Sequence, residues 1–289
     1  MIFFTIVCYL LIFEKRECKT SLRIIGGRDV KENEFPYVVR LELKTLHSLQ
    51  TVNKHLCTAT VIAAKWTLTA AHCMDHDANV WRMAKPVILY EAISMGTRNK
   101  DTTVDVIAWY SHPNYKMFES ITTLSIHNDI CLLKTNFISM STYAKLSAVH
   151  YTAALGFKVL TVGYGIMKEN DTLATTRELK RPLQIIEAVL KKCNERHSTV
   201  CLTTLCNIEH QICPGDSGGP SIHHSGVVGI SSLSSSCHLV QIKKLYNIDI
   251  LRKSMGMAIV TPISPYLDWI MILLARPHTR IHTHISFSF

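Results

Sequence analysis

Three separated segments of the chain carry a histidine, an aspartate and a serine, side chains that could together perform nucleophilic catalysis. The segments are Thr69-Ala-Ala-His72-Cys73, Asn128-Asp129-Ile130 and Gly215-Asp216-Ser217-Gly-Gly-Pro220. A serine hydroxyl is a poor nucleophile at neutral pH unless a base lies within hydrogen-bond reach. An imidazole, with an unperturbed pKa near ~6.5, can take that proton and later return it to a leaving group. These residue types therefore fit His72 as the base and Ser217 as the nucleophile.

Taken together, the three segments resemble the chymotrypsin-like, trypsin-fold serine peptidases, whose catalytic residues follow the chain order His, Asp, Ser. The resemblance covers roughly residues 24 to 274. It implies that Asp129 holds His72 in the reactive tautomer, and in the family the loss of this carboxylate lowers turnover about 10⁴-fold. It also implies an oxyanion hole formed by the backbone N–H groups of Gly215 and Ser217, in a loop whose bend needs glycine.

The family resemblance implies an all-β fold of two six-stranded antiparallel β-barrels with a C-terminal α-helix and the site between the barrels. The apolar pattern of the sequence agrees, because it consists mostly of short β-like runs. Those runs are 37 to 44, 58 to 63, 102 to 109, 130 to 133, 157 to 162 and 227 to 233. One helix is predicted up to Leu274, with Ser264 as its cap and Pro265 in its first turn. A boundary between two β-rich halves is predicted near residues 136 to 156.

A second match concerns Arg23-Ile24-Ile25-Gly26-Gly27, which resembles the activation junction of the family. A cut after Arg23 frees the ammonium group of Ile24. By resemblance, this new terminus folds inward and pairs with Asp216, beside the nucleophile, and a buried ion pair forms only when both charges are present. The uncut chain is therefore expected to be a zymogen with a misformed oxyanion loop.

The N-terminal segment predicts secretion. Residues 1 to 13 are an apolar run too short to span a bilayer, typical of a signal peptide, and residues 14 to 23 would then be the activation propeptide. Ten cysteines also favour an oxidising compartment. Asn170-Asp-Thr172 is a glycosylation sequon, and residues 275 to 289 are expected to be an unstructured tail. We accordingly expect a secreted, extracellular protein without stable membrane insertion.

The family resemblance implies three disulfides: Cys57 with Cys73, Cys193 with Cys206, and Cys213 with Cys237. The first would close the loop that carries His72, and in the chain-entropy model it contributes about 3 kcal/mol. Three further cysteines have no partner in the family pattern: Cys18, Cys131 and Cys201. Cys131 is expected in a buried strand as a small apolar residue, whereas Cys18 could tether the propeptide to Cys201 or to another chain.

The substrate pocket departs from the trypsin-like pattern. By resemblance to the family, its floor lies six residues before the nucleophile, where this chain carries the neutral Gln211 in place of an aspartate. We therefore predict poor cleavage after Lys or Arg, since a buried cation without a counter-charge is unfavourable. The pocket walls are expected to be Ser232, Leu233, Ser234 and Ala258. An insert from His238 to about Met257 separates the last of these from the others, and its role stays open.

Charge and composition limit the partners. The net charge of +9 favours anionic surfaces, but the short Lys pairs 191–192 and 243–244 have no accompanying stacking aromatics, so no nucleic-acid partner is predicted. The histidines of the tail are not expected to form a metal site, and no cofactor is predicted. The expected partners are protein or peptide substrates, an activating trypsin-like protease and protein inhibitors.

Two functions follow from these observations. The first is a secreted serine endopeptidase that hydrolyses peptide bonds through an acyl-enzyme on Ser217. The second is a weakly active or inactive secreted homologue of such an enzyme that binds or regulates other proteins. The complete triad favours the first, and the altered pocket and the extra loop favour the second.

Overall fold

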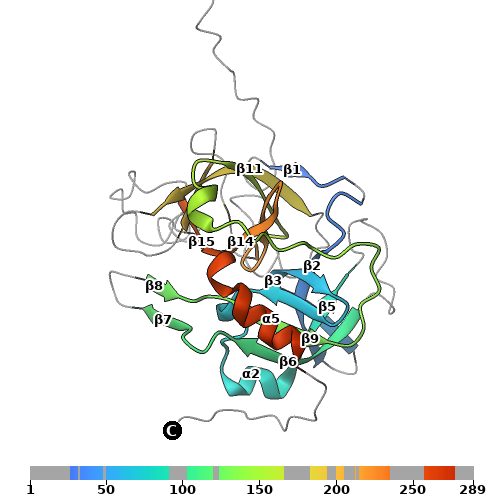
Figure 1. Cartoon of the computed structure of the whole chain (residues 1–289). Helices are drawn as coiled ribbons and strands as arrows, with labels where there is room; N and C mark the ends of the chain where they lie inside the picture. Colours follow the sequence, from blue (N-terminus) through green and yellow to red (C-terminus); the bar gives the residue numbers. More distant parts are fainter. Residues whose placement is uncertain are drawn as a thin grey trace, which may run out of the picture.

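The structure is a computed structural model, and it describes residues 27–31, 33–47, 50–90, 103–119, 124–165, 183–193, 200–204, 212, 215–234 and 257–276. Two groups of antiparallel strands make up most of this part of the chain, joined by short helices (Figure 1). The all-β fold with a C-terminal helix that the sequence predicted is therefore confirmed. Arg23, Ile24, Asn170 and Gln211 lie outside the described residues, as do Cys18, Cys206, Cys213 and Cys237.

Six strands of the first half form a closed barrel in the order β2-β3-β4-β9-β6-β5. They are β2 (Val38–His47), β3 (Gln50–Ala63), β4 (Trp66–Thr69), β5 (Ala84–Leu89), β6 (Thr103–Ser111) and β9 (Cys131–Thr135). Alternate residues of these strands fill the barrel, among them Val39, Leu41, Ala59, Ile88 and Leu133, each fully buried. A hairpin of β7 (Lys116–Glu119) and β8 (Leu124–His127) projects from this half just before Asp129.

The second half contains a seven-stranded sheet in the order β1-β11-β10-β13-β14-β15-β12. Its strands are β1 (Arg28–Asp29), β10 (Lys158–Gly163), β11 (Gln184–Lys192), β12 (Val200–Thr204), β13 (Pro220–His223), β14 (Gly226–Ser234) and β15 (Met257–Pro262). Because β12 pairs with both β15 and β11, the six strands from β10 to β15 are paired in a ring, to which β1 adds at β11.

In the described part of the chain, five short helices connect or cover the strands. They are η1 (Ala71–Cys73), α2 (Ala78–Met83), η3 (Tyr151–Ala154), η4 (Ser264–Tyr266) and α5 (Leu267–Ala275). The α5 helix packs Ile270 and Leu273 into a cluster that also contains Leu68 from the first barrel and Ile230 from the second sheet. The helix therefore joins the two halves, and Figure 1 shows it crossing the front of the first barrel.

The predicted cap of this helix is wrong. Ser264 begins η4, and its hydroxyl accepts a hydrogen bond from the backbone N–H of Tyr151 at 3.0 Å, with no side-chain cap at either helix start. The serine therefore ties the end of the chain to η3. Pro265 does lie in the first turn of η4, where its missing N–H leaves no helical hydrogen bond unmade.

Candidate active site

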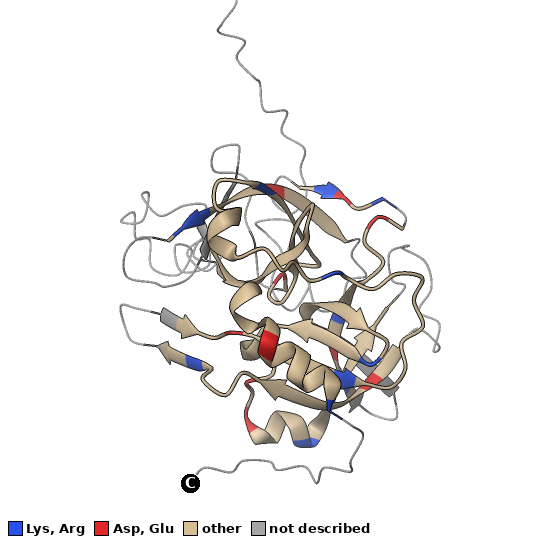
Figure 2. Cartoon of the chain, viewed as in Figure 1, with Lys and Arg blue, Asp and Glu red and all other residues tan. Residues whose placement is uncertain are grey.

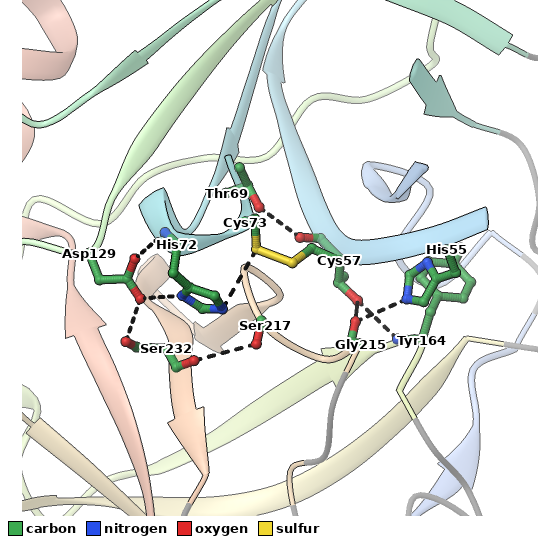
Figure 3. Close-up of a disulfide and its surroundings, with 11 residues drawn as sticks. His55, Cys57, Thr69, His72, Cys73, Asp129, Tyr164, Gly215, Ser217 and Ser232 are labelled. Atoms are coloured by element: carbon green, nitrogen blue, oxygen red, sulfur yellow. Dashed lines mark hydrogen bonds and ion pairs between the residues drawn. A yellow bond between two sulfur atoms is a disulfide. The ribbon is translucent and has the colours of Figure 1, made fainter. Parts of the chain in front are cut away.

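The structure brings His72, Asp129 and Ser217 to one place between the two halves (Figure 3). His72 lies in η1, directly after β4, and Asp129 lies between β8 and β9. Because β4 pairs with β9, with Thr69 opposite Cys131, these two residues start close together. Ser217 lies in the turn before β13, and its carbonyl accepts a hydrogen bond from the N–H of Thr58 in β3 at 2.9 Å.

The carboxylate of Asp129 holds the His72 residue at two points. The backbone N–H of His72 donates to Oδ1 at 2.9 Å, and Nδ1 lies 2.8 Å from Oδ2. Asp129 is 1% exposed, and burial acts to raise its pKa. The charge of His72 and the hydrogen bonds from His72 and Ser232 outweigh burial, so the pKa of Asp129 lies below its ordinary value. An ionised carboxylate only accepts hydrogen bonds, which makes Nδ1 the donor and leaves Nε2 able to act as a base.

Ser232 connects the aspartate with the serine. Its hydroxyl donates to Oδ2 of Asp129 at 2.5 Å, and its carbonyl accepts the Ser217 hydroxyl at 3.4 Å. Among the described residues, the Ser217 hydroxyl makes this long hydrogen bond to Ser232 and none to His72. Nε2 of His72 lies 3.9 Å from Sγ of Cys73. Proton transfer from Ser217 to His72 therefore requires the hydroxyl to turn from Ser232 toward the ring, in keeping with the loose geometry of catalytic hydrogen bonds before substrate binds.

The loop around Ser217 depends on glycine. Gly215 and Gly218 have φ of 99° and 79°, in the left-handed region that other residues rarely adopt. A Cβ at Gly218 would also overlap the carbonyl of Thr58. Within the loop, the N–H of Gly219 donates to the carbonyl of Asp216 at 2.9 Å, which closes a tight turn over the serine. The bond from the N–H of Thr58 to the carbonyl of Ser217 holds this turn close to the first barrel.

Asp216 is 1% exposed and lies against the segment that follows β10. Its Oδ1 accepts the N–H of Gly165 at 2.7 Å. A Cβ on Gly163 or Gly165 would overlap its carboxylate, so this approach requires glycine at both positions. The carboxylate expected to receive the Ile24 ammonium is therefore buried behind the nucleophile loop.

The four residues predicted to form the pocket walls lie on two paired strands. Ser232, Leu233 and Ser234 lie at the end of β14, and Ala258 lies in β15, opposite Ser234 in the strand register. Ser232 and Ala258 are buried, and Leu233 is partly exposed. The pairing of β14 with β15 thus brings together wall residues that the long insert separates in sequence.

Two expectations about the cysteines can be compared with the described part of the chain. Cys57 and Cys73 form a disulfide with a Cα–Cα distance of 6.2 Å (Figure 3), and Cys193 is also disulfide-bonded. Cys131 is a free thiol, fully buried in β9, and burial raises its pKa to about 12. The expectation of a buried, apolar role for Cys131 is therefore confirmed. Cys201 lies in β12.

One cluster of metal-ligating residue types lies in the described part of the chain: Cys57, His72 and Cys73. The two sulfur atoms are bonded to each other in the disulfide, so neither is a thiolate that could ligate a metal.

Lys and Arg lie on both halves of the molecule in the view of Figure 2. No helix among the described residues combines the length and the apolar character needed to cross a membrane.

Sequence reasoning missed two contributors to the site. Thr58 contacts the nucleophile loop, and nothing in the sequence distinguishes it except its position beside Cys57. Asn128 has φ of 51°, and its side chain accepts from the hydroxyl of Tyr266 at 3.0 Å and donates to the carbonyl of Asn114 at 2.7 Å. The preference of asparagine for the left-handed region could have indicated that this residue forms the bend before Asp129.

Comparisons with known proteins identify relatives of the chain and a solved structure with a matching fold. Similar proteins include human granzyme M, 28% identical over 88% of this chain and 90% of the relative, and trypsin V-A of Rattus norvegicus, 26% identical over 95% and 98%. Serine protease SP24D of Anopheles gambiae is 25% identical over 73% of this chain and 71% of its own length. The solved structure of human heparin binding protein has the same fold, with a TM-score of 0.61 and 19% identity over 87% of this chain and 97% of its own. The model of the Trypsin family matches residues 24–270, and the chain belongs to this family of serine proteases.

Proposed function

We propose that this protein is a secreted serine endopeptidase that hydrolyses peptide bonds through an acyl-enzyme on Ser217. The observation that carries the proposal is the pair of hydrogen bonds between His72 and an ionised, buried Asp129. This pair of bonds leaves Nε2 of the imidazole available as a base. Ser232 of β14 contacts both Asp129 and the hydroxyl of Ser217. The family membership supports the same reaction class.

In the proposed reaction, Oγ of Ser217 attacks the carbonyl carbon of the scissile peptide bond while its proton moves to Nε2 of His72. The N–H groups of Gly215 and Ser217 stabilise the oxyanion of the tetrahedral intermediate. The imidazolium, stabilised by Asp129, then protonates the leaving amine, and an ester to Ser217 remains. Water, deprotonated by His72, hydrolyses the ester and restores the serine hydroxyl.

The proposed zymogen step is cleavage after Arg23 by a trypsin-like protease. The ammonium of Ile24 would then enter the buried site of Asp216, whose carboxylate lies against Gly163 and Gly165. Export as a secreted precursor is consistent with the disulfide between Cys57 and Cys73, which forms in oxidising compartments. Glycosylation at Asn170 and control by protein inhibitors belong to the same proposal.

The proposed specificity excludes basic side chains. We expect arginine peptides to be cleaved with a kcat/KM at least about tenfold below that of tyrosine or leucine peptides, because the neutral Gln211 provides no counter-charge. Turnover of three matched peptide substrates by the activated protein measures this. A preference for arginine would contradict the specificity while leaving the reaction class intact.

The reaction class itself is tested by covalent labelling. The protein is cut at Arg23, the Ile24 terminus is verified by sequencing, and a fluorophosphonate probe is added. Ser217 should be labelled, and the variant Ser217→Ala should not. If the correctly processed protein remains unlabelled, the second function, a binding or regulatory homologue, is the better description. That alternative derives from Gln211 and from the insert between His238 and Met257.

A further inference from the structure

We infer that Thr58 is a positioning residue that holds both residues of the oxyanion hole in place, an inference that rests on the proposed function. Thr58 lies in β3 next to the disulfide cysteine Cys57, and it is fully buried. It belongs to the first barrel, whereas Gly215 and Ser217 precede β13 of the second half. The contact therefore crosses between the two halves of the molecule.

Three hydrogen bonds of Thr58 define this role. Its backbone N–H donates to the carbonyl of Ser217 at 2.9 Å, and its hydroxyl Oγ1 donates to the carbonyl of Gly215 at 2.8 Å. The same hydroxyl accepts the backbone N–H of Tyr164 at 3.0 Å. A hydroxyl has a single proton, and a carbonyl can only accept, so the direction of the bond to Gly215 is fixed.

These contacts hold the loop at Gly215 and Ser217, whose N–H groups are the proposed donors to the oxyanion. Gly215 has no side chain to restrain it and adopts φ of 99°, so its carbonyl must be oriented by groups outside the loop. Oγ1 of Thr58 and Nε2 of His55, at 3.1 Å, are two such donors. Fixing the Gly215 carbonyl from one side limits rotation of the backbone that carries the Gly215 N–H.

The N–H of Ser217 is fixed in a related way. The carbonyl of Asp216 turns back to the N–H of Gly219 at 2.9 Å. In a trans peptide the C=O and the following N–H point in opposite directions, so the N–H of Ser217 points away from that turn. The bond from the N–H of Thr58 to the carbonyl of Ser217 then holds the other side of the same residue.

The contact of Thr58 with Tyr164 extends the support into the second half. Tyr164 is buried, its hydroxyl donates to the carbonyl of Val38 at 3.3 Å, and the guanidinium of Arg40 lies 5.8 Å from its ring centre. Tyr164 also precedes Gly165, whose N–H binds Asp216. The Thr58 hydroxyl is therefore shared between the segment that holds Asp216 and the loop that carries the oxyanion hole.

The test compares Thr58→Val, which removes the hydroxyl and keeps the shape and the backbone N–H, with Thr58→Ser, which retains the hydroxyl. The matched control is Thr60→Val, because Thr60 lies two residues further along β3, is fully buried, and has a hydroxyl without a hydrogen-bond partner among the described residues. All proteins are cut at Arg23 and counted by fluorophosphonate labelling before kcat and KM are measured with one peptide substrate.

We expect T58V to lower kcat about tenfold with KM changed less than about twofold, because the oxyanion donors remain but are less well held; direct loss of a donor costs about 10²–10³. T58S should recover kcat to within about threefold of the wild type, and T60V should match the wild type. If Thr58 contributed only to the stability of the protein, we would not expect KM to stay unchanged and kcat to recover in T58S.

The inference is overturned if T58V has the kcat of T60V, or if T58S is as slow as T58V, which would show that the hydroxyl is not responsible. If T58V does not reach the folded state in thermal melting, Thr58→Ala, which is smaller and also lacks the hydroxyl, replaces it in the same comparison. A processed wild-type protein that is neither labelled nor active would contradict the proposed function as well, whereas an active wild type with an equally active T58V contradicts this inference alone.

Discussion

Asp129 is 1% exposed, yet its carboxylate remains ionised because two groups of His72 and the hydroxyl of Ser232 donate to it. These bonds outweigh the effect of burial and lower its pKa. The carboxylate therefore keeps its charge throughout the pH range in which an imidazole gains its proton.

The substitution Asp129→Asn tests this arrangement. An amide can offer its own N–H toward Nδ1 and so favours the wrong tautomer of His72, and we expect kcat to fall about 10⁴-fold. The measurement is kcat of the activated, active-site-counted protein. Asp105→Asn, an exposed aspartate in β6, is the control and should retain wild-type kcat. A D129N protein within tenfold of D105N would remove Asp129 from the proposed mechanism.

The contrast between His72 and Thr58 shows which site residues a sequence can indicate. His72, Asp129 and Ser217 each lie in a short motif whose residue types have an evident chemical use, and the three motifs could be recognised together. Thr58 acts through a hydroxyl that bonds to a loop far along the chain. Only the pairing of the two halves creates that contact, so no local pattern could predict it.

At the scale of elements, η4 and α5 contribute to the site although they carry none of its reacting groups. The hydroxyl of Tyr266, at the end of η4, donates to the side chain of Asn128 at 3.0 Å, and Asn128 forms the left-handed bend directly before Asp129. The charge of Asp129 also contributes, after burial, to the raised pKa of Tyr266. The C-terminal end of the fold therefore supports the position of the aspartate.

Tyr266→Phe removes only the hydroxyl of this contact. We expect a loss of unfolding free energy of about 1 kcal/mol, typical of one hydrogen bond, and a decrease in kcat of about threefold as Asp129 becomes less well placed. Tyr143→Phe is the matched control, because the Tyr143 hydroxyl donates to the carbonyl of Ile138 at 2.9 Å and not to a residue next to the triad. Denaturant unfolding and kcat are measured for both. Equal kcat values in Y266F and Y143F would limit Tyr266 to a role in stability.

The elements themselves were predictable to different degrees. Some predicted strands, such as 227 to 233, appear within one or two residues of their expected bounds, here as β14, whereas β3 begins eight residues before the predicted run 58 to 63. The short α2 helix was not predicted, although Asp77 accepts the N–H of Asn79 as a helix cap. The β7–β8 hairpin was also missed, since its exposed Met117 and Phe118 give no core-facing alternation. Short surface elements lack the burial pattern that identifies core strands.

At the scale of the whole molecule, the site exists only because the two halves pack against each other. The first barrel supplies His72, Asp129 and Thr58, and the second half supplies the loop of Ser217 and the strand of Ser232. The sequence resemblance predicted this division, whereas the apolar pattern alone indicated only a β-rich chain. The order of strands is set by long-range pairing, which local propensity does not encode.

Activation is the property that involves the whole chain, since a cut near its start is expected to act on a loop near residue 216. Asp216 is buried, so a positive partner stabilises it more than solvent can, and the uncut chain lacks the Ile24 ammonium. Arg23→Gln should therefore remain uncut by a trypsin-like protease, with fluorophosphonate labelling at least about 100-fold slower, comparable to losing an oxyanion donor. Lys31→Gln, an exposed basic residue just beyond the junction, should be cut and labelled like the wild type. N-terminal sequencing together with the labelling rate measures both steps. Rapid labelling of intact R23Q would mean that the oxyanion loop forms without the new terminus.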